Sequence, residues 1–347
     1  MQKERNMYLD ILKAVSIILV VIGHCIQYGS GMQYLTYGTC LYNPVFIFIY
    51  SFHMPLFMLI SGFLFSYSLK NKTTKGILFS KIKQIIIPLA CWSFIATIIQ
   101  TVKALTGVSS SQVSFIWICQ TLLSSFWGGP WFLWALWWCS LCVILGKKLF
   151  KDNAIYYVIL LIITFVTPDK NNIALYKFMF PFFLLGYIFN HYDLKTKLKK
   201  IYTHKAFEFS CLIIFILLLK HYDFNSYIYT SGYTLLNKDV LFQLHNDFFR
   251  FFIGIFGSVS IMCIVHAFFQ IAPKIVNKVF AYVGACSLGI YIISNYLFDE
   301  VLKWLPINGL NYWYTLIEVI CVLLITIGIT TLLKKIKITN KLFLGGR

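Results

Sequence analysis

Three ionisable side chains lie along the first apolar segment of the chain, in YLDILKAVSIILVVIGH. At 100° per residue, Lys13 and His24 fall within about 20° of each other around a helix and about 16 Å apart along its axis. Asp10 falls within about 40° of His24 on the same face. An ionisable residue inside a membrane helix costs at least about 2–3 kcal/mol unless it faces protein or water. A line of three on one face therefore predicts a functional site.

His24 is the residue of this face best suited to chemistry. Imidazole is the usual general base near neutral pH, so His24 predicts proton removal from a hydroxyl. The alternative is a structural role, in which a helix carbonyl or a hydroxyl satisfies a neutral imidazole. Asp10 and Lys13 favour the catalytic interpretation, because Lys13 could extend to the membrane surface whereas His24 could not.

A second histidine occurs in the next apolar segment, SFHMPLFMLISGFLF. Pro55 lacks an N–H and its ring disturbs the carbonyl of Ser51, so we expect the helix to kink beside His53. Such a kink opens room for a ligand, although plain packing also explains many kinks. Ser61 and Gly62 fit a seam of small residues that allows close helix packing.

Polar residues also occur in or beside later apolar segments. Arg250 is expected at the head of one segment, where it could pair with Asp247 or clamp an anionic or sugar ligand. Trp131 begins a segment after a Gly-Gly-Pro break, and tryptophan there is first an interface anchor. Lys177 can extend its amine to the surface. Polar groups in mid-helix come from Tyr291, Ser294 and Asn295.

The composition indicates a membrane protein. The chain is 59% hydrophobic and 12% charged, and a soluble domain cannot bury that much apolar surface. The start lacks a signal-peptide cleavage site, so the first helix is expected to stay, and residues 1–347 are expected to form one integral-membrane domain. The predicted fold class is all-α, a polytopic membrane helix bundle. Its ten expected spans are residues 8–28, 44–69, 84–102, 131–146, 154–168, 173–190, 206–220, 248–270, 279–298 and 312–333.

The basic residues indicate the orientation of this bundle. Most of the 30 lysines and arginines fall on one side of the ten-span topology, so both termini are expected in the cytoplasm. The fifth and seventh spans are short for a bilayer of about 30 Å. Residues 113–127 are also apolar, but an eleventh span there would place the lysines at 147–151 outside. We therefore expect a re-entrant or interfacial helix at 113–127.

Two other patterns predict no special chemistry. The net charge of +18 fits the topology and attraction to anionic lipid headgroups, and the dispersed lysines argue against nucleic-acid binding. Cys139 and Cys142 form a CxxC without a second pair, so we expect no metal or redox site.

Four segments of the chain, taken in order, resemble the membrane acyltransferase-3 family of bacterial O-acyltransferases: YLDILKAVSIILVVIGH, FHMPLFMLISGFLF, WFLWALWW and SLGIYIIS. The resemblance covers nearly the whole chain and is to the single-domain branch of the family. It implies a bundle of about ten helices in the cytoplasmic membrane of a bacterium. Such a bundle moves an acyl group, usually acetyl, from cytoplasmic acyl-CoA to a hydroxyl of a cell-envelope glycan, an exopolysaccharide or a lipid-linked precursor.

The chain departs from the family pattern at two positions. The first helix of the family typically carries Arg, ten residues, then His, and Lys13 stands at the position of the arginine. A lysine provides a point charge rather than a bidentate clamp. Ser294 stands where a second His is often found after Leu-Gly-Ile-Tyr, so the resemblance does not carry a second-histidine role to this helix.

The residues and the resemblance together predict a mechanism. His24, supported by His53, would deprotonate the acceptor hydroxyl as it attacks the thioester of acyl-CoA, which is a co-substrate with no other cofactor expected. Lys81, Lys83 and the 195–205 loop are expected to dock the CoA phosphates. The remaining predicted substrate contacts are Asp10 and Lys13 along the CoA arm, Arg250 with the 223–246 loop at the sugar, and Trp131, Ser294 and Asn295.

Two other function classes compete with the transferase. One is an exporter of polysaccharide or lipid-linked sugar, since buried His, Lys and Arg also serve transport paths. The other is an accessory subunit of a glycan synthase. The expected partners are acyl-CoA, the glycan acceptor and membrane lipids, and a homo-oligomer is allowed. Acetyl and succinyl donors both fit the sequence, as do direct transfer and an acyl-enzyme.

Overall fold

The computed structural model describes residues 6–36, 38–108, 112–198, 200, 204–236 and 239–346, and every regular element within them is helical. The first half of the chain contains α1 (Met7–Tyr28), α2 (Met32–Thr36), η1 (Thr39–Tyr42), α3 (Pro44–Tyr50), α4 (His53–Asn71), α5 (Thr74–Lys81), the π-helical turn η2 (Ile82–Ile86), α6 (Ile87–Leu105), α7 (Phe115–Trp127), α8 (Trp131–Phe150) and α9 (Ala154–Val166).

The second half continues with α10 (Ile173–His191), α11 (Leu194–Lys197), α13 (Lys205–Leu219), η3 (Phe224–Ser226), α14 (Ile228–Ser231), α15 (Val240–Ile271), α16 (Lys274–Ala285), α17 (Ser287–Glu300), η4 (Leu302–Trp304), α18 (Tyr312–Lys335) and α19 (Lys337–Phe343). The all-α prediction is confirmed for the described residues.

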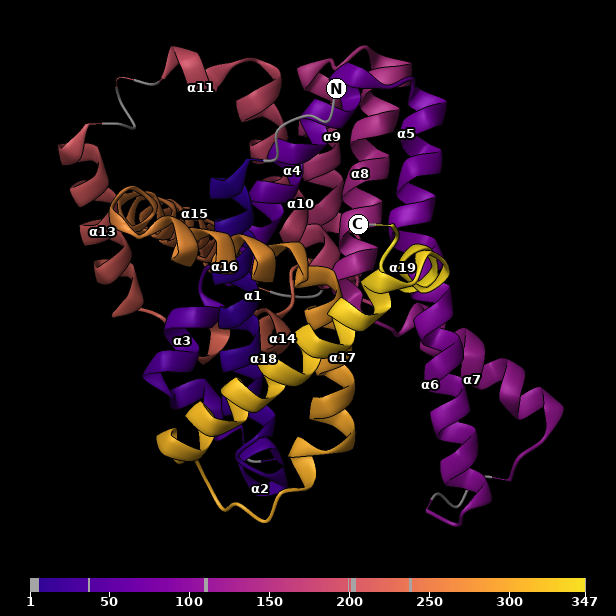
Figure 1. Ribbon diagram of the computed structural model, residues 1–347. Coiled ribbons are helices and arrows are strands. Elements are labelled where there is room, and N and C mark those ends of the chain that lie inside the picture. Colours follow the sequence, from indigo (N-terminus) through magenta and orange to yellow (C-terminus); the bar gives the residue numbers. More distant parts are fainter. Residues whose placement is uncertain are drawn as a thin grey trace.

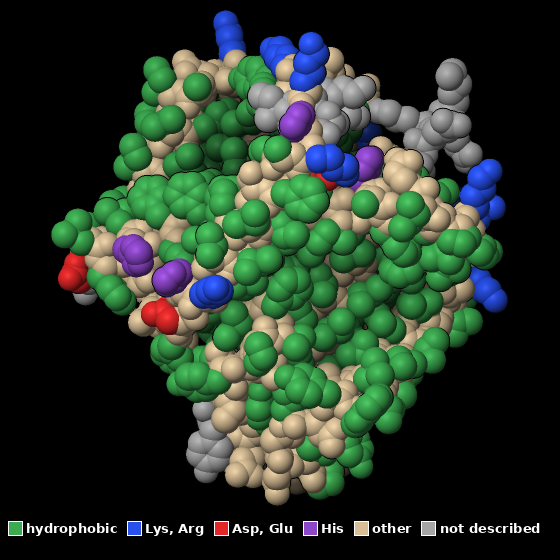
Figure 2. All heavy atoms as spheres, turned by 90° about the vertical axis from the view of Figure 1, so that its left-hand side faces the viewer, with side chains coloured by type: hydrophobic (Ala, Val, Ile, Leu, Met, Phe, Trp, Pro, Cys, Tyr) green, Lys and Arg blue, Asp and Glu red, His purple; other side chains and the backbone are tan. Residues whose placement is uncertain are grey.

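Seven helical stretches of the described chain are long and apolar enough to cross a membrane, or eight if the bent pair of α16 and α17 counts as one. The protein is therefore a multi-pass membrane protein. Its surface is widely apolar in Figure 2, with the lysines and arginines gathered mainly toward the top and one edge of that view. Two predicted spans correspond to shorter helices, α9 with 13 residues and α13 with 15. The count of ten spans and the cytoplasmic termini stay predictions.

Two predicted span boundaries are wrong. The predicted span 279–298 is not one helix, because α16 ends at Ala285 and α17 begins at Ser287 with a bend of 63° between them. The predicted span 248–270 begins too late, because α15 starts at Val240, where the Asp239 side chain accepts hydrogen bonds from the first turn. Arg250 therefore lies ten residues inside a helix rather than at its head, and the predicted 223–246 loop includes the start of α15.

The kink predicted beside His53 is confirmed as a break between α3 and α4. Phe52 has φ −143° and ψ −18°, which interrupts the helix, and α4 begins at the next residue. Pro55 stands in the first turn of α4, where a missing N–H costs least. The break places His53 at the start of α4, where its ring contacts that of Tyr50 in α3.

Small residues let the central helices approach closely. A Cβ at Gly62 of α4 would overlap the Phe183 carbonyl of α10, and one at Gly186 of α10 would overlap the Leu59 carbonyl of α4. The predicted Ser61–Gly62 seam is thus confirmed at Gly62. A Cβ at Gly284 of α16 would likewise overlap the backbone of α1. In Figure 1, α1 lies at the centre of the bundle beside α4, which packs against α10, and α16 crosses α1.

The segment predicted as a re-entrant or interfacial helix is α7, which has only 13 residues and none of them buried. It packs against α6, and the two helices extend away from the bundle at the lower right of Figure 1. Lys103 near the end of α6 forms an ion pair with Glu300 at the end of α17. A short helix at this position agrees with the prediction, and its depth in the membrane stays a prediction.

Candidate active site

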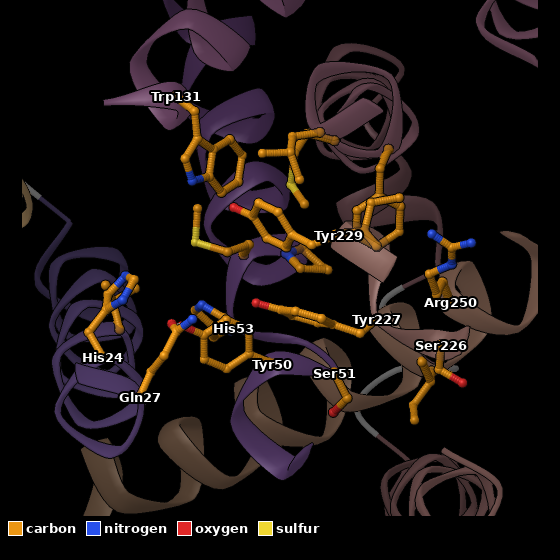
Figure 3. Close-up of a pocket in the computed structure, with 18 of the residues that line it drawn as sticks. His24, Gln27, Tyr50, Ser51, His53, Trp131, Ser226, Tyr227, Tyr229 and Arg250 are labelled. Atoms are coloured by element: carbon orange, nitrogen blue, oxygen red, sulfur yellow. The ribbon is translucent and has the colours of Figure 1, made fainter. Parts of the chain in front are cut away.

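A cavity of about 310 Å³ lies against the C-terminal half of α1, and we call it the histidine cavity. Its walls come from α1, the α3–α4 break, the start of α8, α10, the segment 222–229, α15 and α17. Figure 3 shows His24 and Gln27 projecting from one helix toward Tyr50 and His53, with Tyr227 between them and Arg250. The structure therefore brings the two histidines predicted from the sequence into one cavity.

The His24 ring is held by neighbouring aromatic groups and a single polar side chain. Its ring centroid lies 5.1 Å from that of Phe298 and 5.7 Å from that of Tyr28. Gln27 hydrogen-bonds the imidazole and accepts a hydrogen bond from the Tyr50 hydroxyl at 3.3 Å. The Nδ1 atom has no hydrogen-bond partner within the described part of the chain. A structural histidine would be satisfied by the protein, so this ring nitrogen favours a functional role.

The backbone break fixes the orientation of His53. The ring Nδ1 lies 2.7 Å from the carbonyl oxygen of Ile49, one turn earlier in α3. A carbonyl only accepts hydrogen bonds, so the neutral ring carries its proton on Nδ1 and leaves the Nε2 lone pair as an acceptor. His53 is 3% exposed. It is therefore a buried, oriented acceptor at the wall of the cavity.

Arg250 forms its predicted pair with Asp247, at 3.0 Å, in a buried position. Its other contacts are to the carbonyl oxygens of Asn246 and Gly232 and to the Ser231 hydroxyl, at 2.8–3.1 Å. Four of the five N–H donors of the guanidinium are thus used within the protein. These bonds anchor the end of α14 and the residue after it, and Arg250 also lines the histidine cavity, so its role as a ligand clamp stays a prediction.

A second anchor holds the same part of the chain. The Asp169 carboxylate accepts hydrogen bonds from the backbone N–H groups of Tyr233 and Thr234, at 2.6 and 2.8 Å, and pairs with Lys177 at 2.5 Å. Burial raises the pKa of the Asp169 carboxyl, but Lys177 and the two N–H groups outweigh it and hold that pKa below its ordinary value. Lys177 is buried rather than extended to the surface, so its predicted snorkelling is wrong.

The sequence analysis missed the tyrosines of the cavity. Tyr50, Tyr222, Tyr227 and Tyr229 all line it, and each brings a hydroxyl to a largely aromatic wall. Three of these residues lie within YDFNSYIYTSGY, and this density of tyrosine in a connecting segment was the available signal. Aromatic rings with hydroxyl groups suit a polar organic ligand with apolar faces.

A second cavity of about 690 Å³ lies against the N-terminal half of α1, and we call it the lysine cavity. Asp10 and Lys13 line it and form an ion pair at 3.1 Å. Asp10 is buried, whereas the Lys13 side chain is about a quarter exposed. Ser61 and Tyr67 add hydroxyl groups, and the other walls are mainly aliphatic and aromatic.

The two cavities share three wall residues, Val20, Met54 and Tyr291. On α1, Asp10 and Lys13 line one cavity, Val20 lines both and His24 lines the other. The predicted alignment of ionisable groups on one face of this helix is therefore confirmed.

Of the three other predicted site residues in α8 and α17, one lines a cavity and two do not. Trp131 begins α8, as predicted, and lines the histidine cavity. Ser294 is fully buried and donates to the Tyr291 carbonyl at 3.1 Å, whereas Asn295 interacts with the Tyr291 side chain. Neither lines either cavity.

Lys81 and Lys83, which are predicted to bind CoA phosphates, also lie outside both cavities. The amine of Lys81 lies 4.6 Å from the Phe65 ring centroid, and that of Lys83 lies 4.4 Å from the Phe79 ring centroid. In the 195–205 loop, residues 199 and 201–203 are outside the described residues. The role of these lysines stays a prediction.

The fold and these cavities define a class: a multi-pass membrane protein with two cavities that meet along one central helix. A family model described as an acyltransferase domain matches residues 6–335. The chain therefore belongs to this acyltransferase family, and the resemblance noted in the sequence is confirmed.

Two curated relatives are similar to parts of the chain. Nodulation protein NolL of Sinorhizobium fredii is 29% identical over 238 residues, which cover 65% of this chain and 60% of that protein. Nodulation protein NolL of Mesorhizobium japonicum is 31% identical over 188 residues, which cover 53% of this chain and 48% of that protein. The chain thus spans between about half and three fifths of these relatives. No solved structure matches it.

Proposed function

We propose that this protein is an acyl-CoA-dependent O-acyltransferase of the bacterial cytoplasmic membrane. It moves an acyl group, with acetyl as the first candidate, from cytoplasmic acyl-CoA to a hydroxyl of a cell-envelope or exopolysaccharide glycan or its lipid-linked precursor. The observation that carries this proposal is the pair of cavities that share Val20, Met54 and Tyr291. Two substrates that enter from opposite sides of a membrane need two such sites with a common boundary.

In this proposal the lysine cavity receives the donor. It lies at the N-terminal end of α1, which the predicted topology places at the cytoplasmic side, and its apolar walls suit the pantetheine arm. Lys13 is partly exposed into this cavity and balances negative charge on the donor, while Asp10 holds the ammonium in position. The thioester then lies near Val20 and Met54.

The histidine cavity receives the acceptor sugar. Its tyrosine rings offer faces for stacking and its hydroxyls offer hydrogen bonds. His24 takes the proton of the acceptor hydroxyl while the oxygen attacks the thioester carbon. The C–S bond then breaks, and the leaving thiolate takes the proton from His24. This sequence needs no covalent enzyme intermediate.

His53 and Arg250 support this reaction from the walls. The Nε2 lone pair of His53 accepts a hydrogen bond from a second hydroxyl of the sugar and so orients it. Arg250 acts as a positioning residue, because its bonds to Ser231 and Gly232 hold the segment that contributes Tyr227 and Tyr229.

The test uses bacterial membranes that contain the protein and acetyl-CoA labelled on the acetyl carbon. Label is followed into the glycan fraction, the protein and free acetate for the wild type, His24→Ala and His245→Ala. His245 is an exposed histidine on α15 outside both cavities, so it controls for loss of an imidazole. We expect transfer to glycan in the wild type and in His245→Ala, and none above background in His24→Ala.

Two results would overturn the proposal. Equal transfer in His24→Ala would remove His24 from the chemistry. No transfer in the wild type with either acetyl-CoA or succinyl-CoA, in membranes where the protein is inserted, would favour a sugar exporter instead.

A further inference from the structure

Tyr291 occupies a position that the mechanism above does not use. It lies on α17, is 7% exposed and is one of the three residues that line both cavities. The other two, Val20 and Met54, have no group that can donate a hydrogen bond. Tyr291 is thus the polar residue of the shared boundary.

The contacts of the Tyr291 hydroxyl place it at this boundary. The backbone N–H of Phe132 donates to the hydroxyl oxygen at 3.3 Å, in the first turn of α8. Trp131, one residue earlier, lines the histidine cavity, whereas Phe132 lines the lysine cavity. Asn295, one turn further along α17, also interacts with the Tyr291 side chain. The bond from Phe132 uses a lone pair of the oxygen and not the hydroxyl proton, so the hydroxyl keeps its capacity to donate one hydrogen bond.

We propose that Tyr291 is a catalytic residue that donates this proton in a hydrogen bond to the oxyanion of the acyl-transfer intermediate. The inference rests on the proposed function and deepens it. When the oxygen of the acceptor sugar bonds to the thioester carbon, the carbonyl π electrons move onto the carbonyl oxygen. The proton of the sugar hydroxyl passes to His24. The oxyanion collapses to the ester, and the thiolate leaves with the proton from His24. Tyr291 keeps its own proton throughout.

Two other polar groups, His53 and Lys13, are less suited to this role. His53 has its proton on Nδ1, bonded to the Ile49 carbonyl, so its free nitrogen is an acceptor. Lys13 lines only the lysine cavity, three turns along α1 from His24. A donor fixed before the reaction, at the place where negative charge develops, is the usual source of oxyanion stabilisation.

The test compares two substitutions that each remove one hydroxyl from α17. Tyr291→Phe keeps the ring that walls both cavities. Tyr296→Phe is the matched control, because its hydroxyl also bonds a backbone atom, the Trp92 carbonyl at 2.8 Å, and it lines neither cavity. The assay measures transfer of labelled acetyl from acetyl-CoA to membrane glycan. The maximal rate is normalised to inserted protein, and the half-saturating acetyl-CoA concentration is measured alongside it.

We expect Tyr291→Phe to lower the maximal rate by about 100-fold and to change the half-saturating concentration by less than about threefold, the pattern of a lost oxyanion donor. Tyr296→Phe should keep the maximal rate within about threefold. A rate in Tyr291→Phe equal to that of Tyr296→Phe, or a change only in half-saturation, would overturn the assignment. The wild type must first show His24-dependent transfer. Absence of that transfer would contradict the proposed function, whereas its presence with an unchanged rate in Tyr291→Phe would contradict only the role of Tyr291.

If Tyr291→Phe does not accumulate in the membrane, Asn295→Ala provides the second variant. It leaves the hydroxyl in place and removes a group that interacts with the Tyr291 side chain. A severalfold lower maximal rate is expected, and a wild-type rate in inserted Asn295→Ala would contradict the assignment.

Discussion

The histidine cavity is walled by two imidazoles and several tyrosines, whereas the lysine cavity has about twice its volume and mainly apolar walls around one ion pair. Both lie along the same face of α1. Under the proposed function, this difference lets one helix serve two substrates: its N-terminal half presents a charge within an apolar space, and its C-terminal half presents a base within a polar aromatic space. Substitutions in the two cavities should therefore affect donor binding and chemistry separately.

The largest effect is expected for His24, the proposed general base in the histidine cavity. His24→Ala should lower the acyl-transfer rate at saturating acyl-CoA by about 1,000-fold, because general-base catalysis typically contributes 10²–10⁴-fold. His53→Ala should lower it by only about tenfold, since His53 orients the acceptor. The two rates are measured with labelled acetyl-CoA in matched membranes. A larger loss in His53→Ala than in His24→Ala would reverse the roles assigned to the two histidines.

The next effect is expected in the lysine cavity. Lys13→Ala should raise the KM for acyl-CoA by about tenfold, because one charge-assisted contact is worth about 1.5–3 kcal/mol, part of which solvent near Lys13 screens. Lys13→Arg keeps the charge and should stay within about threefold of the wild type. Initial rates over a range of acyl-CoA concentrations give these values. An unchanged KM in Lys13→Ala would show that the donor lies elsewhere.

A smaller effect is expected at the tyrosines of the histidine cavity. Tyr229→Phe removes one hydroxyl and should raise the half-saturating acceptor concentration by about threefold to tenfold, because a net hydrogen bond contributes about 0.5–1.5 kcal/mol. The KM for acyl-CoA should not change. The measurement uses a soluble fragment of the glycan that receives label in the wild type. A change in the acyl-CoA KM instead would contradict the separation of the two sites.

The smallest effect concerns the anchor above the histidine cavity. Asp169→Asn removes the pair with Lys177 and should lower Tm by about 2–4 °C near neutral pH, as expected for about 1 kcal/mol. The pKa of Asp169 is held below its ordinary value, so its stabilisation is present above about pH 3.9 and is lost as the pH falls through the folded value. Thermal unfolding in detergent at several pH values checks this. A Tm difference that persists at low pH would exclude the charge as its cause.

Much of this arrangement could be predicted from local sequence. Helical spacing alone aligned Asp10, Lys13 and His24, and Pro55 indicated the break that orients His53. Both features depend on short-range geometry, which a single helix determines. The small-residue seam at Gly62 could also be predicted, because close approach of two helices requires a residue without a Cβ.

Other features depend on contacts distant in sequence and could not be predicted from it. The pair of Arg250 with Asp247 could be predicted, but two other anchors of its side chain, Ser231 and Gly232, come from a segment almost twenty residues earlier. The bend at Cys286 was missed, because the residues around it read as one continuous apolar segment. The tyrosines near α14 enter the cavity only when that segment packs against α3, where the Tyr227 ring contacts those of Phe46 and Tyr50. Tertiary packing, rather than local propensity, places these groups.

The proposed function depends on a division of roles in which donor binding and chemistry occupy different cavities along α1. Its most direct measurement is CoA binding by calorimetry to the purified protein in lipid nanodiscs, for the wild type, His24→Ala and Lys13→Ala, beside acetyl transfer by the same samples. We expect His24→Ala to bind CoA as the wild type does but to transfer no acetyl, and Lys13→Ala to bind CoA about tenfold more weakly. Loss of CoA binding in His24→Ala with full binding in Lys13→Ala would contradict this division of roles.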